Sequence, residues 1–180
     1  MVAAPAIRYD LDDQDRIVAL GGPWDSFALE NDGPQVQSDL IRGRPIWSFV
    51  TGELTRMWLQ TVFQLVRSQK QPITRPYRCD SPHLRRFMQM RIQSGPAGKL
   101  SIYHDILRIE QRSQPVYIHY ELDEQEISFR ARCSFCNRVK QGQHWMEPDA
   151  ANAHPERTIT VTSSVCPDCQ GDLQQIGAGL

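Results

Sequence analysis

Four of the five cysteines in the sequence form two pairs with the same spacing. Cys133 and Cys136 lie in RCSFCNRVK, and Cys166 and Cys169 lie in SSVCPDC. A gap of two residues lets both thiolates of one tight turn reach the same ion, and four thiolates about 2.3 Å from the metal suit Zn²⁺. Such a shell leaves no position for water or substrate, so the spacing predicts a structural zinc site. Iron remains an alternative occupant of this site, because four cysteine ligands also suit iron.

The same cysteines allow a second interpretation, as a thiol-redox sensor. The Cys-Pro-Asp-Cys pair has the spacing of a thioredoxin-like motif, but spacing alone does not establish a reactive thiolate. The surrounding sequence lacks the βαβ pattern of that fold, and the other pair offers a metal-binding partner. We therefore prefer the metal interpretation. A zinc site that also responds to oxidation remains an alternative.

Short strands must bring the two pairs together. The segment NRVKQGQHWM can form a β-hairpin around Gln141-Gly142-Gln143, and RTITVTSSV is β-branched enough to return as a strand to the second pair. Residues 128–180 therefore predict a small zinc-ribbon-like module. A module of about 50 residues with few large apolar side chains needs the folding free energy that metal binding supplies.

The overall composition indicates a globular, cytoplasmic protein. The chain has 180 residues and a formal net charge of −1. Its N-terminus lacks the basic and apolar regions of a secretory signal, and no stretch of about 18 residues is apolar enough to span a membrane. Thiols stay reduced in the cytoplasm, which favours metal binding over disulfides.

Neither catalysis nor nucleic-acid binding is expected. The sequence contains no Gly-rich phosphate loop, nucleophile elbow or kinase signature, and the predicted metal shell has no open position. Charges of both signs balance in residues 128–180, which predicts weak phosphate binding. A zinc-dependent nucleic-acid-binding regulator nevertheless remains as an alternative from another functional class.

Residues 1–112 contain periodic segments typical of an α+β fold. Ile7–Leu11 and Arg16–Leu20 flank an Asp-rich turn and predict a β-hairpin. A short helix follows, with Trp24, Phe27 and Ala28 on one face. The segment TGELTRMWLQTVFQLVRSQK predicts a long helix, in which these apolar residues fall at helical spacing: Leu54, Met57, Trp58, Val62, Leu65 and Val66.

Three strands are expected after the long helix. Ile73–Cys79 contains Pro76, which suits an edge strand or a bulge. In RRFMQMRIQS, methionine and isoleucine alternate with polar residues, and KLSIYHDILRIE follows after a GPAG turn. These elements predict a single antiparallel sheet with helices packed on it. Clustered arginines could contact an anionic partner, but we expect solvated residues at strand ends: Arg75, Arg78, Arg85 and Arg86.

The element order over about residues 5–112 resembles a PAS domain. The stretches YDLDDQDRIVALGGPWDSFA, GRPIWSFV and YRCDSPHLRRFMQMRI are also similar to a group of bacterial PAS-like proteins. The resemblance implies a sensory or interaction module, with a five-stranded antiparallel sheet and helices that cover a ligand-sized cleft. It implies no particular ligand.

The remaining residues resemble a cysteine-rich tail that accompanies PAS and other signalling domains in bacterial regulators. The shared pattern comprises Cys133, Cys136, Arg138, Gly142, Trp145, Cys166, Pro167 and Cys169. Two residues separate Gly142 from Trp145, where the pattern has one, and Ser164-Val165 stands where such tails often have His-Gly. No histidine therefore lies beside the second pair as an alternative ligand.

Side chains that could line the predicted cleft are aromatic residues, methionines and one histidine: Trp24, Phe27, Trp47, Met57, Trp58, Met88, Met90 and His104. Residues of these types are more often simple core, and an isolated histidine is more often hydrogen-bonded than a haem or metal ligand. Neither haem nor flavin is expected, because the long helix has no histidine and the Cys-containing helix motif of flavin-binding PAS relatives is absent.

The sequence thus predicts a stand-alone PAS-like signalling protein. Residues 1–112 form the sensory or interaction domain, residues 113–127 a linker, and residues 128–180 the zinc module. A protein partner is expected to receive the signal, while a small-molecule ligand and a homodimer stay open.

Overall fold

The computed structural model describes residues 6–31, 33–120, 130–151 and 158–171. The chain divides into two compact units. The first contains Met1–Thr51, Thr55–Tyr77 and Phe87–Arg108, and the second contains Gly52–Leu54, Arg78–Arg86 and Ile109–Leu180. Among the described residues, no helix is long and apolar enough to cross a membrane.

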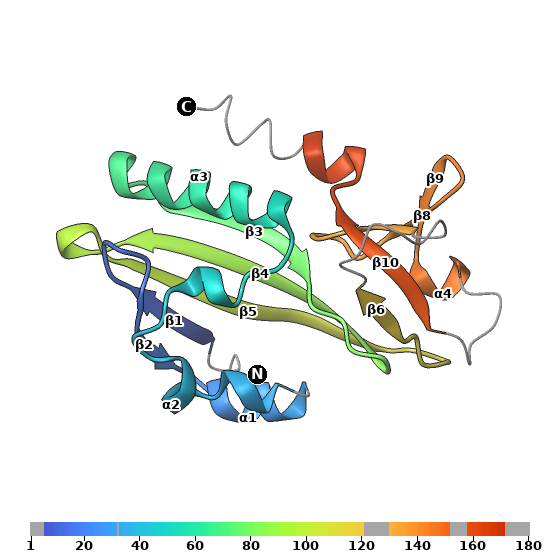
Figure 1. Ribbon diagram of the computed structural model, residues 1–180, viewed down its shortest axis with the longest axis horizontal. Helices are drawn as coiled ribbons and strands as arrows, with labels where there is room; N and C mark the ends of the chain where they lie inside the picture. Colours follow the sequence, from blue (N-terminus) through green and yellow to red (C-terminus); the bar gives the residue numbers. More distant parts are fainter. Residues whose placement is uncertain (1–5, 32, 121–129, 152–157, 172–180) are drawn as a thin grey trace. The chain divides into compact units, whose positions relative to one another are not determined.

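The first unit is built on a five-stranded antiparallel sheet with the strand order β2-β1-β5-β4-β3 (Figure 1). Its strands are β1 (Ile7–Leu11), β2 (Ile17–Gly21), β3 (Ile73–Arg78), β4 (Leu84–Ser94) and β5 (Leu100–Gln111). The predicted antiparallel sheet is confirmed. Strand β3, which contains Pro76, lies at an edge as predicted, because proline cannot donate to a second neighbour.

The turn between β1 and β2 is organised by the side chain of Asp12. Its carboxylate accepts hydrogen bonds from the backbone N–H groups of Gln14 and Arg16, at 2.9 and 2.8 Å. Asp15 adopts a φ of 60°, which aspartate tolerates better than most residues. The predicted hairpin is confirmed, with β2 beginning one residue later than expected.

Helical segments connect β2 to β3: α1 (Trp24–Glu30), η1 (Pro34–Val36), α2 (Ser38–Ile41), η2 (Ile46–Ser48) and α3 (Glu53–Gln69). Side chains of α1 hold the segments that follow it. The Asp25 carboxylate accepts hydrogen bonds from the backbone N–H and the hydroxyl of Ser38, and the Trp24 indole N–H donates to the carbonyl of Val36 at 2.8 Å. These contacts join α1, η1 and α2 into one layer.

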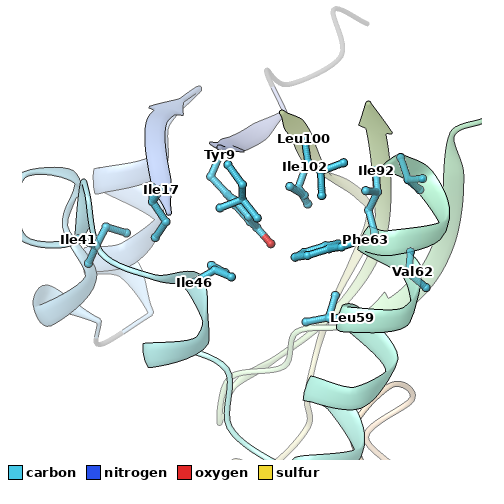
Figure 2. Close-up of a cluster of buried hydrophobic side chains, with 12 residues drawn as sticks. Tyr9, Ile17, Ile41, Ile46, Leu59, Val62, Phe63, Ile92, Leu100 and Ile102 are labelled. Atoms are coloured by element: carbon cyan, nitrogen blue, oxygen red, sulfur yellow. The ribbon is translucent and has the colours of Figure 1, made fainter. Parts of the chain in front are cut away.

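The core of the first unit lies between this layer, α3 and one face of the sheet (Figure 2). Phe63 projects from α3 into the cluster and is 1% exposed, with its ring centroid 5.6 Å from that of Trp47. Burial of a side chain of this size contributes roughly 2–3 kcal/mol. The other buried members are Tyr9, Leu11, Ile17, Ile41, Ile46, Leu59, Val62, Val66, Ile92, Leu100 and Ile102.

Helix α3 buries only part of the predicted apolar face, including Val62 and Val66. Leu54 and Met57 are 46% and 54% exposed, whereas Leu59 and Phe63 are buried. The prediction for Leu54 and Met57 was wrong. At 3.6 residues per turn, Met57 lies about 160° around the helix from Leu59, and apolar residue types alone do not decide which stripe meets the sheet.

The second unit contains a mixed sheet with the order β6-β10-β7-β8-β9. Its strands are β6 (Ile118–Tyr120), β7 (Arg130–Cys133), β8 (Val139–Gln141), β9 (His144–Met146) and β10 (Ile159–Ser164). Strand β10 runs parallel to β6 and β7, and the β8–β9 hairpin confirms the predicted turn, with a φ of 59° at Gly142. Ala151, the last residue of α4 (Pro148–Ala151), belongs to a small core. The other described members of this core are Val116, Val139, Ile159 and Val161.

The two units and the predicted domains have different limits. Strand β6 lies inside the segment assigned to a linker, and residues 78–86 belong to the second unit. Whether the predicted domains fold separately stays a prediction.

Candidate metal centre and apolar cavity

The first cysteine pair lies in a tight turn between β7 and β8. Cys133 is the last residue of β7, and its backbone N–H donates to the carbonyl of Arg138 at 2.8 Å. Asn137 closes the turn with a φ of 62°, a conformation in which asparagine is enriched. The turn therefore directs Cys133 and Cys136 to one side, as the two-residue gap predicts.

The second pair follows the end of β10. The parallel pairing of β10 with β7 sets Ser164 opposite Cys133, and the backbone N–H of Ser134 donates to the carbonyl of Ser164 at 2.9 Å. A helical turn begins at Pro167, and the N–H of Gln170 donates to the carbonyl of Cys166. Strand pairing thus brings the two turns together across 30 residues of sequence.

The four sulfur atoms form a compact cluster. All four Sγ atoms lie within 4.8 Å of one another, and those of Cys136 and Cys166 are 3.6 Å apart. Tetrahedral ligands about 2.3 Å from a zinc ion would be about 3.8 Å apart. Cys133 and Cys166 are almost fully buried. The cluster could therefore hold a metal ion such as zinc.

The close approach of these thiols and their burial shift their pKa values. A hydrogen bond from the Cys136 thiol, with others from backbone N–H groups, lowers the pKa of Cys133 to about 4. The same hydrogen bond, together with burial, raises the pKa of Cys136. Burial and the Cys133 charge raise the pKa of Cys169 to about 12. Several thiolates can share this space only beside a cation, because like charges in a buried site oppose one another.

The turn that contains Cys133 and Cys136 also forms hydrogen bonds with Arg78, at the start of the segment of residues 78–86. The backbone N–H of Arg78 donates to the carbonyl of Phe135 at 2.7 Å, and the Asn137 amide donates to the carbonyl of Arg78 at 3.3 Å. Phe135 and Asn137 flank Cys136 in the sequence. Both peptide groups of Arg78 are therefore held by the cysteine turn.

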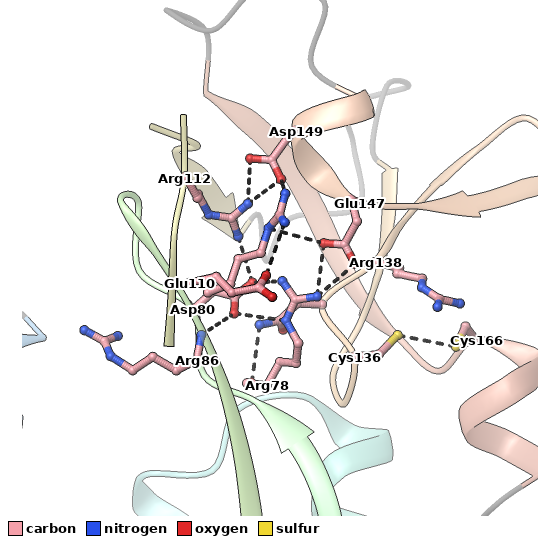
Figure 3. A network of polar contacts seen from close by, with 12 residues as sticks. Arg78, Asp80, Arg86, Glu110, Arg112, Cys136, Arg138, Glu147, Asp149 and Cys166 are labelled. Atoms are coloured by element: carbon pink, nitrogen blue, oxygen red, sulfur yellow. Dashed lines mark hydrogen bonds and ion pairs between the residues drawn. The ribbon is translucent and has the colours of Figure 1, made fainter. Parts of the chain in front are cut away.

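A network of charged residues completes this attachment (Figure 3). The Arg78 guanidinium donates to Glu147 at 2.8 Å and to Asp80 at 3.1 Å. Asp80 also accepts from Arg112 at 2.8 Å, and Arg112 donates to Asp149 at 2.7 Å. Hydrogen bonds from Arg85 and Arg112 outweigh burial and lower the pKa of Asp149. Arg78, Asp80 and Arg112, the buried charges of this network, are thus each paired with an opposite charge, as burial requires.

The expectation that the clustered arginines are solvated was wrong. Arg75, Arg78 and Arg86 are 3%, 9% and 5% exposed. Arg75 lies over the Trp58 ring, with 5.4 Å from its guanidinium carbon to the ring centroid, while Arg78 meets carboxylates up to 69 residues away. An ion pair between residues so far apart in the sequence cannot be predicted from the residues next to either partner.

The first unit contains an apolar cavity of about 230 Å³ between α1, η1 and the inner face of the sheet. Its described lining comprises Ile7, Trp24, Phe27, Ala28, Asn31, Gly33, Val36, Tyr77, Met88 and His104. Cavities lined mainly by aromatic and aliphatic residues with a few polar groups are typical of ligand sites.

Half of the predicted cleft residues line this cavity and half do not. Trp24, Phe27, Met88 and His104 contribute to its wall. Trp47, Trp58 and Met90 instead pack against the core, and Met57 lies on the exposed side of α3. Sequence reasoning missed Tyr77, which precedes Arg78 on β3.

His104 is the central polar residue of the cavity. Its Nδ1 lies 2.8 Å from the Tyr77 hydroxyl, and its ring stacks on Tyr9 with the centroids 5.5 Å apart. Burial lowers the pKa of His104 to about 4, so the ring is neutral at physiological pH.

Comparison of the sequence with known protein families and curated proteins assigns it to no family. No family model matches the chain, and no curated protein matches it. Functional interpretation therefore depends on the cysteine cluster and the cavity.

Proposed function

We propose that this chain is a PAS-like sensory or interaction protein of the cytoplasm, with a structural zinc ion in its cysteine cluster. A small molecule occupies the apolar cavity, and a protein partner receives the signal. The role is binding rather than catalysis. The observation that supports it best is the cavity of about 230 Å³, because its described wall combines helical segments with residues of β1, β3, β4 and β5.

A ligand at this position would act on two structural layers at once. Trp24 and Ala28 belong to α1, whereas Met88 and His104 belong to β4 and β5. A molecule that contacts both layers binds more tightly to the arrangement that closes around it. Ligand binding would therefore shift how α1 packs on the sheet, and that surface is the one we assign to signal output.

Zinc is the preferred occupant of the cysteine cluster. Four cysteine sulfurs suit zinc in a closed structural site, and the small apolar core of the second unit leaves stabilisation for a metal to provide. The ion would be held by Cys133, Cys136, Cys166 and Cys169, and it would neutralise thiolates that repel one another.

Native mass spectrometry of the freshly purified full chain tests both assignments. We expect one zinc ion per chain and a retained small molecule, and the same spectrum reports any dimer. Cys133→Ala should lose the metal, whereas Cys79→Ala should keep it, because Cys79 lies outside the cluster. A chain that binds no metal when reduced and forms disulfides on mild oxidation would instead support the redox-sensor alternative. Salt-dependent DNA binding tighter than micromolar would support the nucleic-acid alternative.

A further inference from the structure

The polar groups of the cavity wall are mostly occupied by each other or by the backbone. The Trp24 indole N–H donates to the Val36 carbonyl at 2.8 Å, and the Asn31 amide donates to the Phe27 carbonyl at 2.7 Å. His104 Nδ1 meets the Tyr77 hydroxyl. The other ring nitrogen, Nε2, has no hydrogen-bond partner among the described residues. This nitrogen therefore remains for a molecule inside the cavity.

The charge of the wall limits what can enter. None of the described lining residues is Asp, Glu, Lys or Arg. A charged molecule would lose its hydration there without gaining a counter-charge, which is costly. His104 does not supply one, because burial keeps its ring neutral. The occupant should therefore be uncharged.

Size and shape limit it further. An apolar cavity of about 150 Å³ accepts benzene, so a volume of about 230 Å³ accommodates about ten non-hydrogen atoms. The wall presents Trp24 and Phe27 beside the His104–Tyr77 pair, and aromatic walls favour flat rings through stacked and edge contacts.

Building on the function proposed above, we propose that the cavity binds an uncharged aromatic molecule of about ten non-hydrogen atoms, which accepts a hydrogen bond from Nε2–H of His104. We assign the Tyr77 hydroxyl as the donor to Nδ1, 2.8 Å away, because a phenol donates a hydrogen bond to imidazole more readily than it accepts one, and this places the ring proton on Nε2. Tyr77 is therefore a positioning residue, and His104 is the residue that contacts the ligand.

Three probes of similar size distinguish the possible hydrogen bonds: quinoline accepts one, indole donates one, and naphthalene does neither. We would titrate each into the ¹⁵N-labelled full chain at pH 7.5 and follow the amide spectrum. Quinoline should bind on the order of fivefold more tightly than naphthalene or indole, the ratio expected for one hydrogen bond. The charged probe 2-naphthoate should bind at least about tenfold more weakly than naphthalene.

Matched variants assign the effect to His104. His104→Phe should abolish the advantage of quinoline while it keeps a ring in the wall. Leu107→Gln, at an exposed position of the same strand, should leave all affinities unchanged. Ala28→Leu, which enlarges a wall residue on α1, should weaken every probe. In Tyr77→Phe, the ¹⁵N shifts of the His104 ring should report a mixture of tautomers, and part of the quinoline preference should disappear.

The outcomes separate this inference from the proposed function. If indole binds more tightly than quinoline, or if His104→Phe leaves the ratio unchanged, the donor assignment is wrong while the ligand cavity stands. Equal affinity for naphthoate and naphthalene would overturn the requirement for an uncharged molecule. If no probe binds to the folded parent chain, or if Ala28→Leu binds every probe as tightly as the parent does, the ligand-sensing function itself fails.

Discussion

His104 combines two properties at the scale of a single residue. Its ring forms part of a cavity wall, and it is also a titratable group that the fold keeps neutral. Tyr9 stacks on one side, Tyr77 bonds to Nδ1, and the charge of Asp105 partly opposes the effect of burial. Protonation of His104 must therefore overcome burial and disturb its contacts with Tyr9 and Tyr77.

This gives a stability change with a defined sign. Because burial lowers the pKa of His104 from 6.5 to about 4, the unfolded chain binds its proton more readily than the folded chain. The stabilisation by neutral His104 is present above pH 6.5 and is lost as the pH falls toward 4. We expect the free energy of unfolding to fall by about 2 kcal/mol between pH 7 and pH 4.5 relative to His104→Phe. Urea denaturation of both proteins measures the difference, and equal pH dependence would contradict the assigned burial.

At the scale of elements, the turn that contains Cys133 and Cys136 contributes to the cysteine cluster and also holds a neighbouring strand end. Its Phe135 carbonyl and Asn137 amide hold Arg78, the last residue of β3. The buried network of Asp80 and Arg112 extends from that point, with side chains 4% and 2% exposed. Loss of a metal ion from the cysteine cluster should therefore loosen both this turn and residues 78–86.

Metal removal tests this link. After chelation under reducing conditions, the amide hydrogen of Arg78 should exchange on the order of tenfold faster, because the turn that supplies its acceptor loosens. The amide of Val66, in the middle of α3, is the internal control and should keep its exchange rate. Hydrogen exchange followed by NMR measures both. Unchanged protection at Arg78 after complete loss of metal would show that the turn is stable without an ion.

At the scale of the whole molecule, the two units have different sources of stability. The first has an extended apolar core around Phe63, whereas the second has a core of five buried residues together with the charge network and the cysteine cluster. We therefore expect substitutions in one unit to leave the main property of the other intact.

Phe63→Ala should lower the free energy of unfolding by about 3–5 kcal/mol, because it leaves a cavity in the core. Met57→Ala, at an exposed position of the same helix, should cost less than about 1 kcal/mol. Both variants should bind as much metal as the parent chain, since all four cysteines lie in the second unit. Guanidinium denaturation and metal analysis provide the measurements, and the milder Phe63→Leu serves if Phe63→Ala does not fold. Loss of metal in Phe63→Leu would contradict independent stabilisation.

Features that depend on short-range patterns could be predicted from the sequence alone. The Asp-rich turn, the edge position of Pro76, the β8–β9 hairpin and the grouping of four cysteines all follow from residue types a few positions apart. The cysteine cluster was predictable although its pairs are 30 residues apart, because two identical gaps favour a shared ion.

Other features were decided only by the tertiary structure. The sequence alone does not show which stripe of α3 meets the sheet, why Arg78 is buried, or that Tyr77 approaches His104. In each case the deciding contact joins distant residues, such as Arg78 and Glu147, which are 69 positions apart. Burial of a charge or a ring depends on which partner the fold brings to it, and no local pattern encodes that partner. The sequence by itself therefore determined which four cysteines form the cluster, and the packing of sheet and helices decided the cavity.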